Sequence, residues 1–579
     1  MTVGAETFAE HITRRPAATG DTAEATRRGA QLDALLGDPH APANPHGLTN
    51  LLAADARHRP PGETEWLLAR AGLGAEFVPV AHGGRLTRVD LLDRVLRPVS
   101  RRDVTLGYRS GLGSLLAACA VWTSGTEQQR ASTAALLLGG GRIAGAPQNG
   151  PARGEIVARP TTGGFRLDGR GEGIIDGNRA DAYVVHARTG PAGTPHSDSV
   201  LLLRAGRPGL RILPGPLATG LRGAPCRAVE LTDCAAPDRA LIGGVGEGVA
   251  LGLRSRQVGD CLVPGLLVTA SGTALHSAVR ASCEGRSDGI AHRWQGPLAG
   301  VFADLLACDS LATVAMRALS LLPDRAQVPA AAARYLVPGV LRENLEQLTS
   351  VLGARGHERD SARYGMLGRL MRDLPAVAPA TSAADCQSVI APQLRELAER
   401  SWFAEDMPPP GLFRLCAELP AFDHRLLTAV NRGDFLASTL LASAARVASV
   451  RGIGGQIGVL SDLAGLCVGE LRELRERLLE MPAPGAGEYP VAAWCALTDR
   501  YALVAAAAAV LGVWESQDGS DPFLAAPAWA VLALIRIVGR LGLRAPEPPA
   551  DVLETVRNEL VRRQRGHISF DLHAAVATW

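Results

Sequence analysis

The chain has 579 residues, of which 47% are hydrophobic and 20% charged, and its formal net charge is +2. This length and composition suffice for a large buried core and for more than one domain. All 60 basic residues are arginine, which excludes a Schiff-base lysine, and their mixing with acidic residues favours solvated helix faces over contacts with nucleic acid.

Signals for export, membrane insertion and metal binding are weak. The first residues lack the apolar core of a signal peptide. The most apolar runs, Tyr501–Trp514 and Phe523–Val538, are shorter than the roughly 20 residues that a membrane span needs, so we interpret them as core helices. Ten cysteines form no CxxC pair, and the histidines show no metal-ligand spacing. We expect a cytoplasmic protein without metal, membrane or nucleic-acid partner.

The first 140 residues are predicted to be mainly helical. Up to about residue 60 the chain is rich in Pro, His and Ala, which is typical of irregular structure with short helices. From Glu63 to about Gly140 the apolar spacing is helical. In Arg88–Val99, for example, four apolar residues fall on one face: Leu91, Leu92, Val95 and Leu96.

The pattern changes to short strands near Arg142. Gly163–Gly169 is typical of a hairpin turn that leads into a strand. Turn residues separate the further strand candidates, which are Ala182–Ala187, Ser199–Arg204 and Ala228–Leu231. Helical periodicity returns after Gly248 and continues to about Trp402, and Pro408–Pro410 mark a boundary before another helical region.

The predicted fold class is therefore mostly α with a small central β-domain. We expect an N-terminal helical domain at 1–141, a β-domain at 142–242, a helical domain at 243–404 and a C-terminal helical extension at 405–579. A parallel α/β sheet in 142–242 would contradict this interpretation.

Several short strings occur in a specific order along these regions. They are Gly72-Leu73-Gly74 with Val78-Pro79 and His82-Gly83-Gly84, Gly125–Arg130, Leu167–Asp181, Gly220–Gly223, Gly246–Gly248, Leu352–His357 and Arg372-Asp373. In order and spacing they resemble the acyl-CoA dehydrogenase superfamily over about residues 60–400. The region after 404 resembles the extra helical domain of its longer members, which implies a dimer.

The resemblance implies a flavin and a catalytic base, and several residues depart from what the flavin needs. Family members place a Trp and a Thr against the flavin, where this chain has Glu172 and Ile175. Ile175 has no hydroxyl donor, and each lost hydrogen bond costs about 1–3 kcal/mol in a buried site. In the preceding loop, Pro147 removes both a hydroxyl and a backbone donor. We therefore expect no bound cofactor, with FAD as the alternative.

The two base positions that the family uses also differ. Thr381 occupies the position of the common glutamate, and a hydroxyl is not a base near neutral pH without help. The alternative position is Gly259, with Asp260 beside it. Asp260 is thus the candidate catalytic carboxylate, and the competing interpretation is an ion pair with Arg254 or Arg256.

A glycine loop resembles the segment that in the family reaches a neighbouring subunit's flavin adenine and pyrophosphate. Its candidate cofactor-binding residues are Gly353, Arg355 and Gly356, and a purely structural loop is the alternative. The family's phosphate-binding arginine corresponds to Arg293 or Arg286.

Three functions remain open from the sequence. The first is an enzyme that uses the acyl-thioester cavity for non-redox chemistry in specialised biosynthesis, on a CoA or carrier-protein thioester or a derived small molecule. The second is a non-catalytic subunit that pairs with a related dehydrogenase. The third is a flavin-dependent oxidoreductase with a rebuilt site. The chain is expected to form a homodimer or a heteromer.

Overall fold

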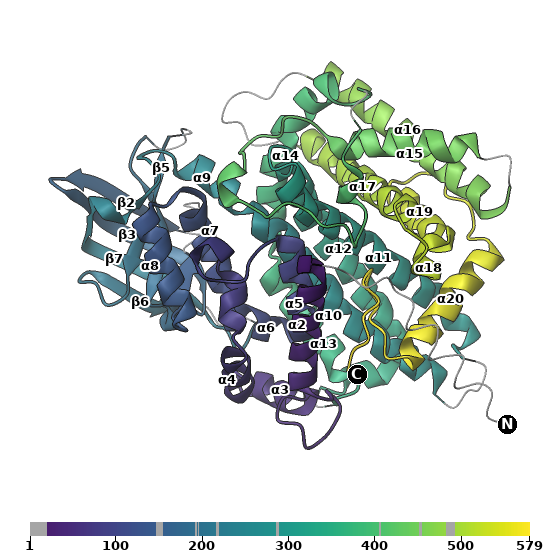
Figure 1. Ribbon diagram of the computed structural model, residues 1–579, viewed down its shortest axis with the longest axis horizontal. Helices are drawn as coiled ribbons and strands as arrows, with labels where there is room; N and C mark the ends of the chain where they lie inside the picture. Colours follow the sequence, from purple (N-terminus) through teal and green to yellow (C-terminus); the bar gives the residue numbers. More distant parts are fainter. Residues whose placement is uncertain are drawn as a thin grey trace.

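The computed structural model describes residues 20–145, 154–191, 194, 196–215, 219–284, 289–359, 361–404, 407–450, 454–481 and 492–578. In these residues helices precede a sheet, follow it and continue through the C-terminal region. Figure 1 shows the sheet at one end of the molecule and the last helices at the other. The predicted class, mostly helical with a small β-domain, is confirmed. The exact domain boundaries stay predictions.

The N-terminal helices include one that the sequence analysis missed. α2 runs for 17 residues and buries Ala25, Leu32 and Leu36, so the expectation of only irregular structure and short helices before residue 60 is wrong. These apolar residues lie on one face, which packs against α5. The elements are α2 (Gly20–Leu36), α3 (Leu48–Ala56), α4 (Gly62–Arg70), α5 (Val89–Arg102), α6 (Val104–Gly107), α7 (Gly113–Ser124) and α8 (Glu127–Leu138).

The sheet is mixed and largely antiparallel. Its strand order is β6-β7-β3-β2-β4-β5-β8, and β1 pairs parallel with β4. The predicted hairpin is present, since β2 and β3 pair from Thr161 opposite Gly164. The strands are β1 (Ile143–Gly145), β2 (Gly154–Thr161), β3 (Gly164–Ile175), β4 (Ala182–Arg188), β5 (Asp198–Arg204), β6 (Leu210–Pro214), β7 (Cys226–Pro237) and β8 (Leu241–Ile242).

Long helices form the central core after the sheet. They are α9 (Gly248–Ser255), α10 (Gln257–Cys283), α11 (His292–Leu321), α12 (Gln327–Leu352), α13 (Gly365–Val377) and α14 (Ala380–Arg400). α10, α11 and α12 pack on one another and are apolar on most sides, as helices surrounded by protein are.

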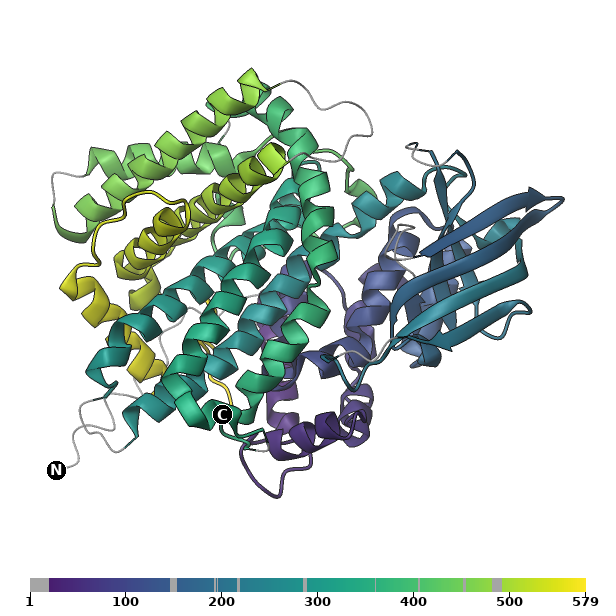
Figure 2. The same cartoon turned by 180° about the vertical axis from the view of Figure 1, so that it is seen from behind.

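The C-terminal extension packs on this core. Its helices are α15 (Phe435–Ser449), α16 (Gly455–Glu480), α17 (Ala492–Glu515), α18 (Pro522–Ala525), α19 (Ala528–Arg540) and α20 (Ala550–Arg565). The predicted helix Tyr501–Trp514 is part of the longer α17, and α17 and α19 lie along α11 (Figures 1 and 2).

Four helical stretches are long and apolar enough to cross a membrane by length and composition. Between 78% and 100% of their most apolar windows is buried inside the fold. They are Val104–Ser124, Gly248–Cys283, His292–Leu321 and Ala492–Glu515.

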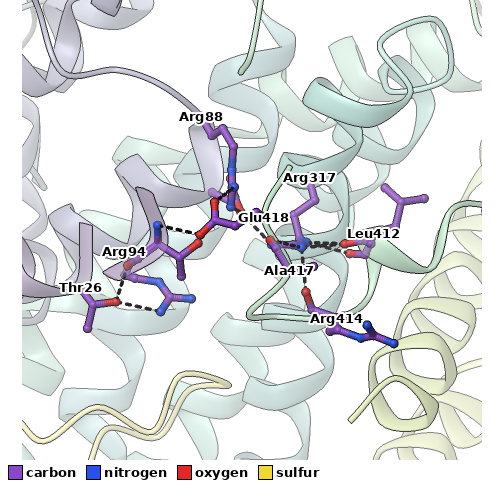
Figure 3. A network of polar contacts seen from close by, with 11 residues as sticks. Thr26, Arg88, Arg94, Arg317, Leu412, Arg414, Ala417 and Glu418 are labelled. Carbon is purple, nitrogen blue, oxygen red and sulfur yellow. Dashed lines mark hydrogen bonds and ion pairs between the residues drawn. The ribbon is translucent and has the colours of Figure 1, made fainter. Parts of the chain in front are cut away.

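A strap of extended chain, residues 407–434, joins the central helices to the extension. Arg317 of α11 is 1% exposed and binds the strap by donating from Nε to the Leu412 carbonyl at 3.0 Å and from Nη2 to the Arg414 carbonyl at 2.7 Å. Its Nη1 donates to Asp90 at 2.8 Å, and Arg88 also donates to Asp90. Figure 3 shows Arg317 directed at Leu412 and Arg414 of the strap. One buried cation therefore ties the strap to both α5 and α11.

Replacing Arg317 should destabilise the protein strongly. Arg317→Gln removes one of the two arginines that bind Asp90 and leaves several strap carbonyls without their donor, and loss of one member of a buried pair costs about 3–5 kcal/mol. The matched control is Arg400→Gln, whose exposed pair with Glu396 is worth about 0–1 kcal/mol. The free energy of unfolding from urea titration checks this. Equal losses in the two variants would contradict the assigned role of Arg317.

Candidate functional site

A cavity of about 640 Å³ lies where the sheet meets the central helices; we call it the first cavity. Its walls come from the segment before α7, the ends of β3 and β7, strand β4, the α9–α10 region, α12 and the turn between α13 and α14. The lining is mainly apolar, with a few polar side chains, as in many sites for small molecules. The polar or ionisable members are Tyr108, Glu172, His186, Cys226, Ser255, Arg256, Asp260, Arg334, Ser382 and Asp385.

Two of the family-like strings meet at one wall of this cavity. The Leu221 backbone N–H donates to Asp373 Oδ1 at 2.8 Å. A Cβ on Gly220 would lie 2.1 Å from the Arg372 carbonyl oxygen, so only glycine permits this approach. The contact explains why a Gly-Leu string and an Arg-Asp string, about 150 residues apart in sequence, occur together.

Asp260 lies in the cavity as one half of an ion pair. Its Oδ2 accepts a hydrogen bond from Arg256 Nε at 2.8 Å, one helical turn earlier. Burial would lower the pKa of Arg256, but the Asp260 carboxylate outweighs this and holds that pKa above its ordinary value. The ion pair that we considered as the competing interpretation is therefore present, and a catalytic role of Asp260 stays a prediction.

The structure brings the predicted flavin-facing positions into the same cavity. Glu172 and Ile175, at the end of β3, line it together with Gly259 and Asp260. The Glu172 carboxylate pairs with Arg170 at 2.6 Å, and the pair is partly exposed. Pro147 lies outside the described residues, as does the side chain of Thr381.

The glycine loop lies apart from this cavity within one chain. Arg334 of α12 lines the cavity, and Gly353 comes directly after the end of this helix, roughly 28 Å further along its axis. Arg355 is held by Glu284 at 2.5 Å and lies over the Tyr364 ring. Gly353 and Gly356 therefore do not contribute to the first cavity of their own chain, and their role in cofactor binding stays a prediction.

The phosphate-binding candidates also lie elsewhere. Arg293 stacks on Trp294 and does not line the first cavity, and Arg286 is outside the described residues.

Sequence reasoning missed Tyr108. This residue opens a kinked segment, Tyr108–Leu112, that joins α6 to α7. Gly111 has φ 142°, and its Cβ would lie 2.2 Å from Phe77, so the turn needs glycine. The neighbouring Arg109 anchors the turn by donating to Asp176 at 2.8 Å and to the Gly223 carbonyl at 2.6 Å. The glycines at positions 111 and 113 were the feature of the sequence that could have pointed to this segment.

His186 is a second missed residue. It lies in the apolar strand β4, lines the cavity, and its Nδ1 has no hydrogen-bond partner among the described residues. Burial lowers the pKa of His186 to about 4, so the imidazole is neutral near pH 7. In the sequence, the feature that could have pointed to this residue was a single histidine within a predicted apolar strand.

Comparison with known proteins assigns the fold. No family model matches the chain. Isobutyryl-CoA dehydrogenase from Dictyostelium discoideum is 27% identical over 194 residues, which are 32% of this chain and 46% of that protein. The chain thus spans about half the length of the curated relatives it matches.

Solved structures extend the likeness to nearly the whole chain. An acyl-CoA dehydrogenase from Bacillus anthracis, complexed with FAD, superposes with a TM-score of 0.65 at 14% identity over 95% of this chain and 96% of that one. The chain has the acyl-CoA dehydrogenase fold, and part of its sequence is similar to members of that superfamily. The prolyl acyl carrier protein oxidase AnaB matches 64% of this chain and 98% of its own, at 16% identity and a TM-score of 0.55.

The expectation of no cofactor is wrong by these comparisons. The B. anthracis structure holds FAD, and so do further structures with this fold. The expectation relied on three positions, Glu172, Ile175 and Pro147, whereas a ring in a cavity can also be held by other backbone groups and by other side chains.

The residues of this acyl-CoA dehydrogenase-like chain fit a flavin ring. The first cavity has the volume of a cofactor site, about 300–1,000 Å³. His186 offers a neutral imidazole with an unused nitrogen, and Gly173, with φ 82°, lines the wall without a side chain. His186 and the backbone around Gly173 would hold the ring.

The buried, neutral His186 should make stability depend on pH. The folded protein binds this proton less tightly than the unfolded chain, whose histidine pKa is 6.5. The free energy of unfolding therefore falls below pH 6.5 and levels off near pH 4. Between pH 7 and 4.5 this contribution is about 2 kcal/mol. In His186→Leu the free energy of unfolding should fall by about 2 kcal/mol less between pH 7 and pH 4.5 than in the unchanged protein. Urea unfolding at both pH values would measure this difference. An unchanged decline would contradict a buried neutral His186.

Proposed function

We propose that this chain is a flavin-dependent oxidoreductase that acts on an acyl thioester, or on a small molecule derived from one. The observation that carries the proposal is the first cavity, which combines an apolar lining with the Asp260 carboxylate and the unused imidazole nitrogen of His186. The printed names of the relatives support a thioester: one acts on isobutyryl-CoA and another on a prolyl carrier protein.

Asp260 is the residue that we propose as the base. Only its Oδ2 is hydrogen-bonded to a side chain in the described part of the structure, so Oδ1 remains to accept a proton from substrate. The carbon next to a thioester carbonyl carries a proton that a positioned carboxylate can remove. Arg256 fixes the rotamer of Asp260 through the ion pair at 2.8 Å.

Bound FAD would supply the two-electron acceptor for this oxidation. The chain's own residues supply the rest. The apolar walls exclude water, and the rigid α10 presents Asp260 to the cavity. We also propose that the chain forms a dimer, as its resemblance to the longer family members implies.

The proposed activity is tested with the full chain and FAD. Purified protein mixed with FAD should retain the flavin absorbance after gel filtration. Anaerobic addition of isobutyryl-CoA or a prolyl carrier protein should then bleach that absorbance for the accepted substrate. A chain that retains no flavin, or a retained flavin that no acyl thioester bleaches, would contradict the proposed function.

Asp260→Asn separates a base from a structural residue. The substitution keeps the shape and one hydrogen-bonding oxygen, so we expect FAD to remain bound and the bleaching rate to fall about a hundredfold or more. The matched control is Asp385→Asn, a second carboxylate at the same cavity. Loss of bleaching in the Asp385 variant alone would assign the base to Asp385.

A further inference from the structure

One end of the first cavity holds a cation with a free donor. Arg334 of α12 lines the cavity there, together with the turn between α13 and α14. Its Nη2 donates to the Val377 carbonyl at 2.7 Å, which fixes the guanidinium. Its Nη1 is buried and makes no hydrogen bond with any residue that the structure describes. A buried donor without an acceptor is unfavourable, so this nitrogen favours a ligand that supplies one.

No carboxylate among the described residues neutralises Arg334. Asp260 and Glu172 also line the cavity, but each is paired with another arginine, at 2.8 and 2.6 Å. Asp385 lines the cavity as well, and in the described part of the chain it forms no ion pair with Arg334. A guanidinium keeps its proton even when it is buried. The end of the cavity at Arg334 is therefore positively charged.

Tyr108 supplies a second donor at the same end. The residue is 8% exposed, and its hydroxyl lies within reach of the Arg334 guanidinium. Burial raises the pKa of Tyr108, and the Arg334 cation only partly offsets this, so the hydroxyl stays protonated near neutral pH. Tyr108 comes from the kinked segment before α7, and Arg334 comes from α12. Two donors from two separate elements therefore converge on one end of the cavity.

We propose that Arg334 and Tyr108 bind a carboxylate at the far end of the substrate's acyl group. A carboxylate has two oxygens, which can accept from Arg334 Nη1 and from the Tyr108 hydroxyl at once. Hydrogen bonds that involve charged groups are roughly twice as strong as neutral ones. A purely hydrocarbon acyl group would instead cover the Arg334 guanidinium without pairing its charge, which is unfavourable.

The substrate class that follows is a thioester of a dicarboxylic acid, and this inference rests on the proposed function. Asp260 lies on α10, which packs on α12. A substrate held at its far end by Arg334 has one orientation in the cavity, with the carbon next to the thioester carbonyl left for Asp260. Arg334 therefore selects and orients the substrate, whereas Asp260 acts on it. A free dicarboxylic acid offers the same carboxylate and is the second source.

The test compares dicarboxylic and neutral acyl-CoA thioesters of equal carbon number by equilibrium dialysis with the full chain. Succinyl-, glutaryl- and adipyl-CoA are paired with butyryl-, valeryl- and hexanoyl-CoA. We expect at least one dicarboxylic thioester to bind about tenfold or more tightly than its neutral partner. Arg334→Gln should abolish that preference while the neutral thioester keeps its affinity, and Tyr108→Phe should reduce the preference about threefold. The matched control is Arg342→Gln, an exposed arginine two turns later on α12, which should keep the full preference.

A second arm repeats the comparison with the free diacids succinate, glutarate and adipate against butyrate, valerate and hexanoate. An Arg334-dependent preference for a diacid, with no thioester bound, supports the carboxylate site with a free acid as its source and contradicts the thioester of the proposed function. Neither arm needs a flavin, so failure to retain FAD sinks the proposed function alone. The comparison in the unchanged chain decides even if Arg334→Gln does not fold. Absence of any preference for the dicarboxylic form in both arms, or a preference that Arg334→Gln retains or that Arg342→Gln removes equally, overturns the proposal.

Discussion

The arrangement depends on burying arginines in a chain that has no lysine. A guanidinium offers five donors in a plane, so one side chain can satisfy several carbonyls and a carboxylate at once. Arg317 does this between α5, α11 and the strap. That junction holds the strap against α5 and α11 where the chain passes from the central helices to the extension, and the packing of α17 and α19 on α11 completes the attachment.

The same residue chemistry shapes both cavities. In the first, Arg256 holds Asp260 on a rigid helix at the boundary with the sheet. In a second cavity, of about 600 Å³ between α12 and helices α17 and α19, Arg540 fixes Glu343 and leaves Arg342 as the free charge among the described residues. An acid is thus presented in one cavity and a cation in the other, on the two sides of the turn between α13 and α14.

Sequence predicted the fold well because its signals are local or repeated. The hairpin before β3 and the return of helical periodicity after Gly248 follow from turn residues and apolar spacing. The site was predicted less completely. Glu172, Ile175 and Asp260 were placed in one cavity by resemblance, but Tyr108, His186 and Arg334 reach it only through tertiary packing. The cofactor expectation failed because loss of two side-chain contacts does not remove a cavity.

The kink at Tyr108–Leu112 breaks the helical path, because Gly111 has φ 142° and a non-helical backbone. Each residue turns an α-helix by about 100°, so the number of residues in the kink sets the rotational phase of α7, which follows it. Leu116 of α7 faces the first cavity and Gly259 because of that phase. The shape of the cavity is therefore encoded in chain length as much as in side-chain identity. A homologue one residue shorter here would present a different face of α7, even with every lining residue retained.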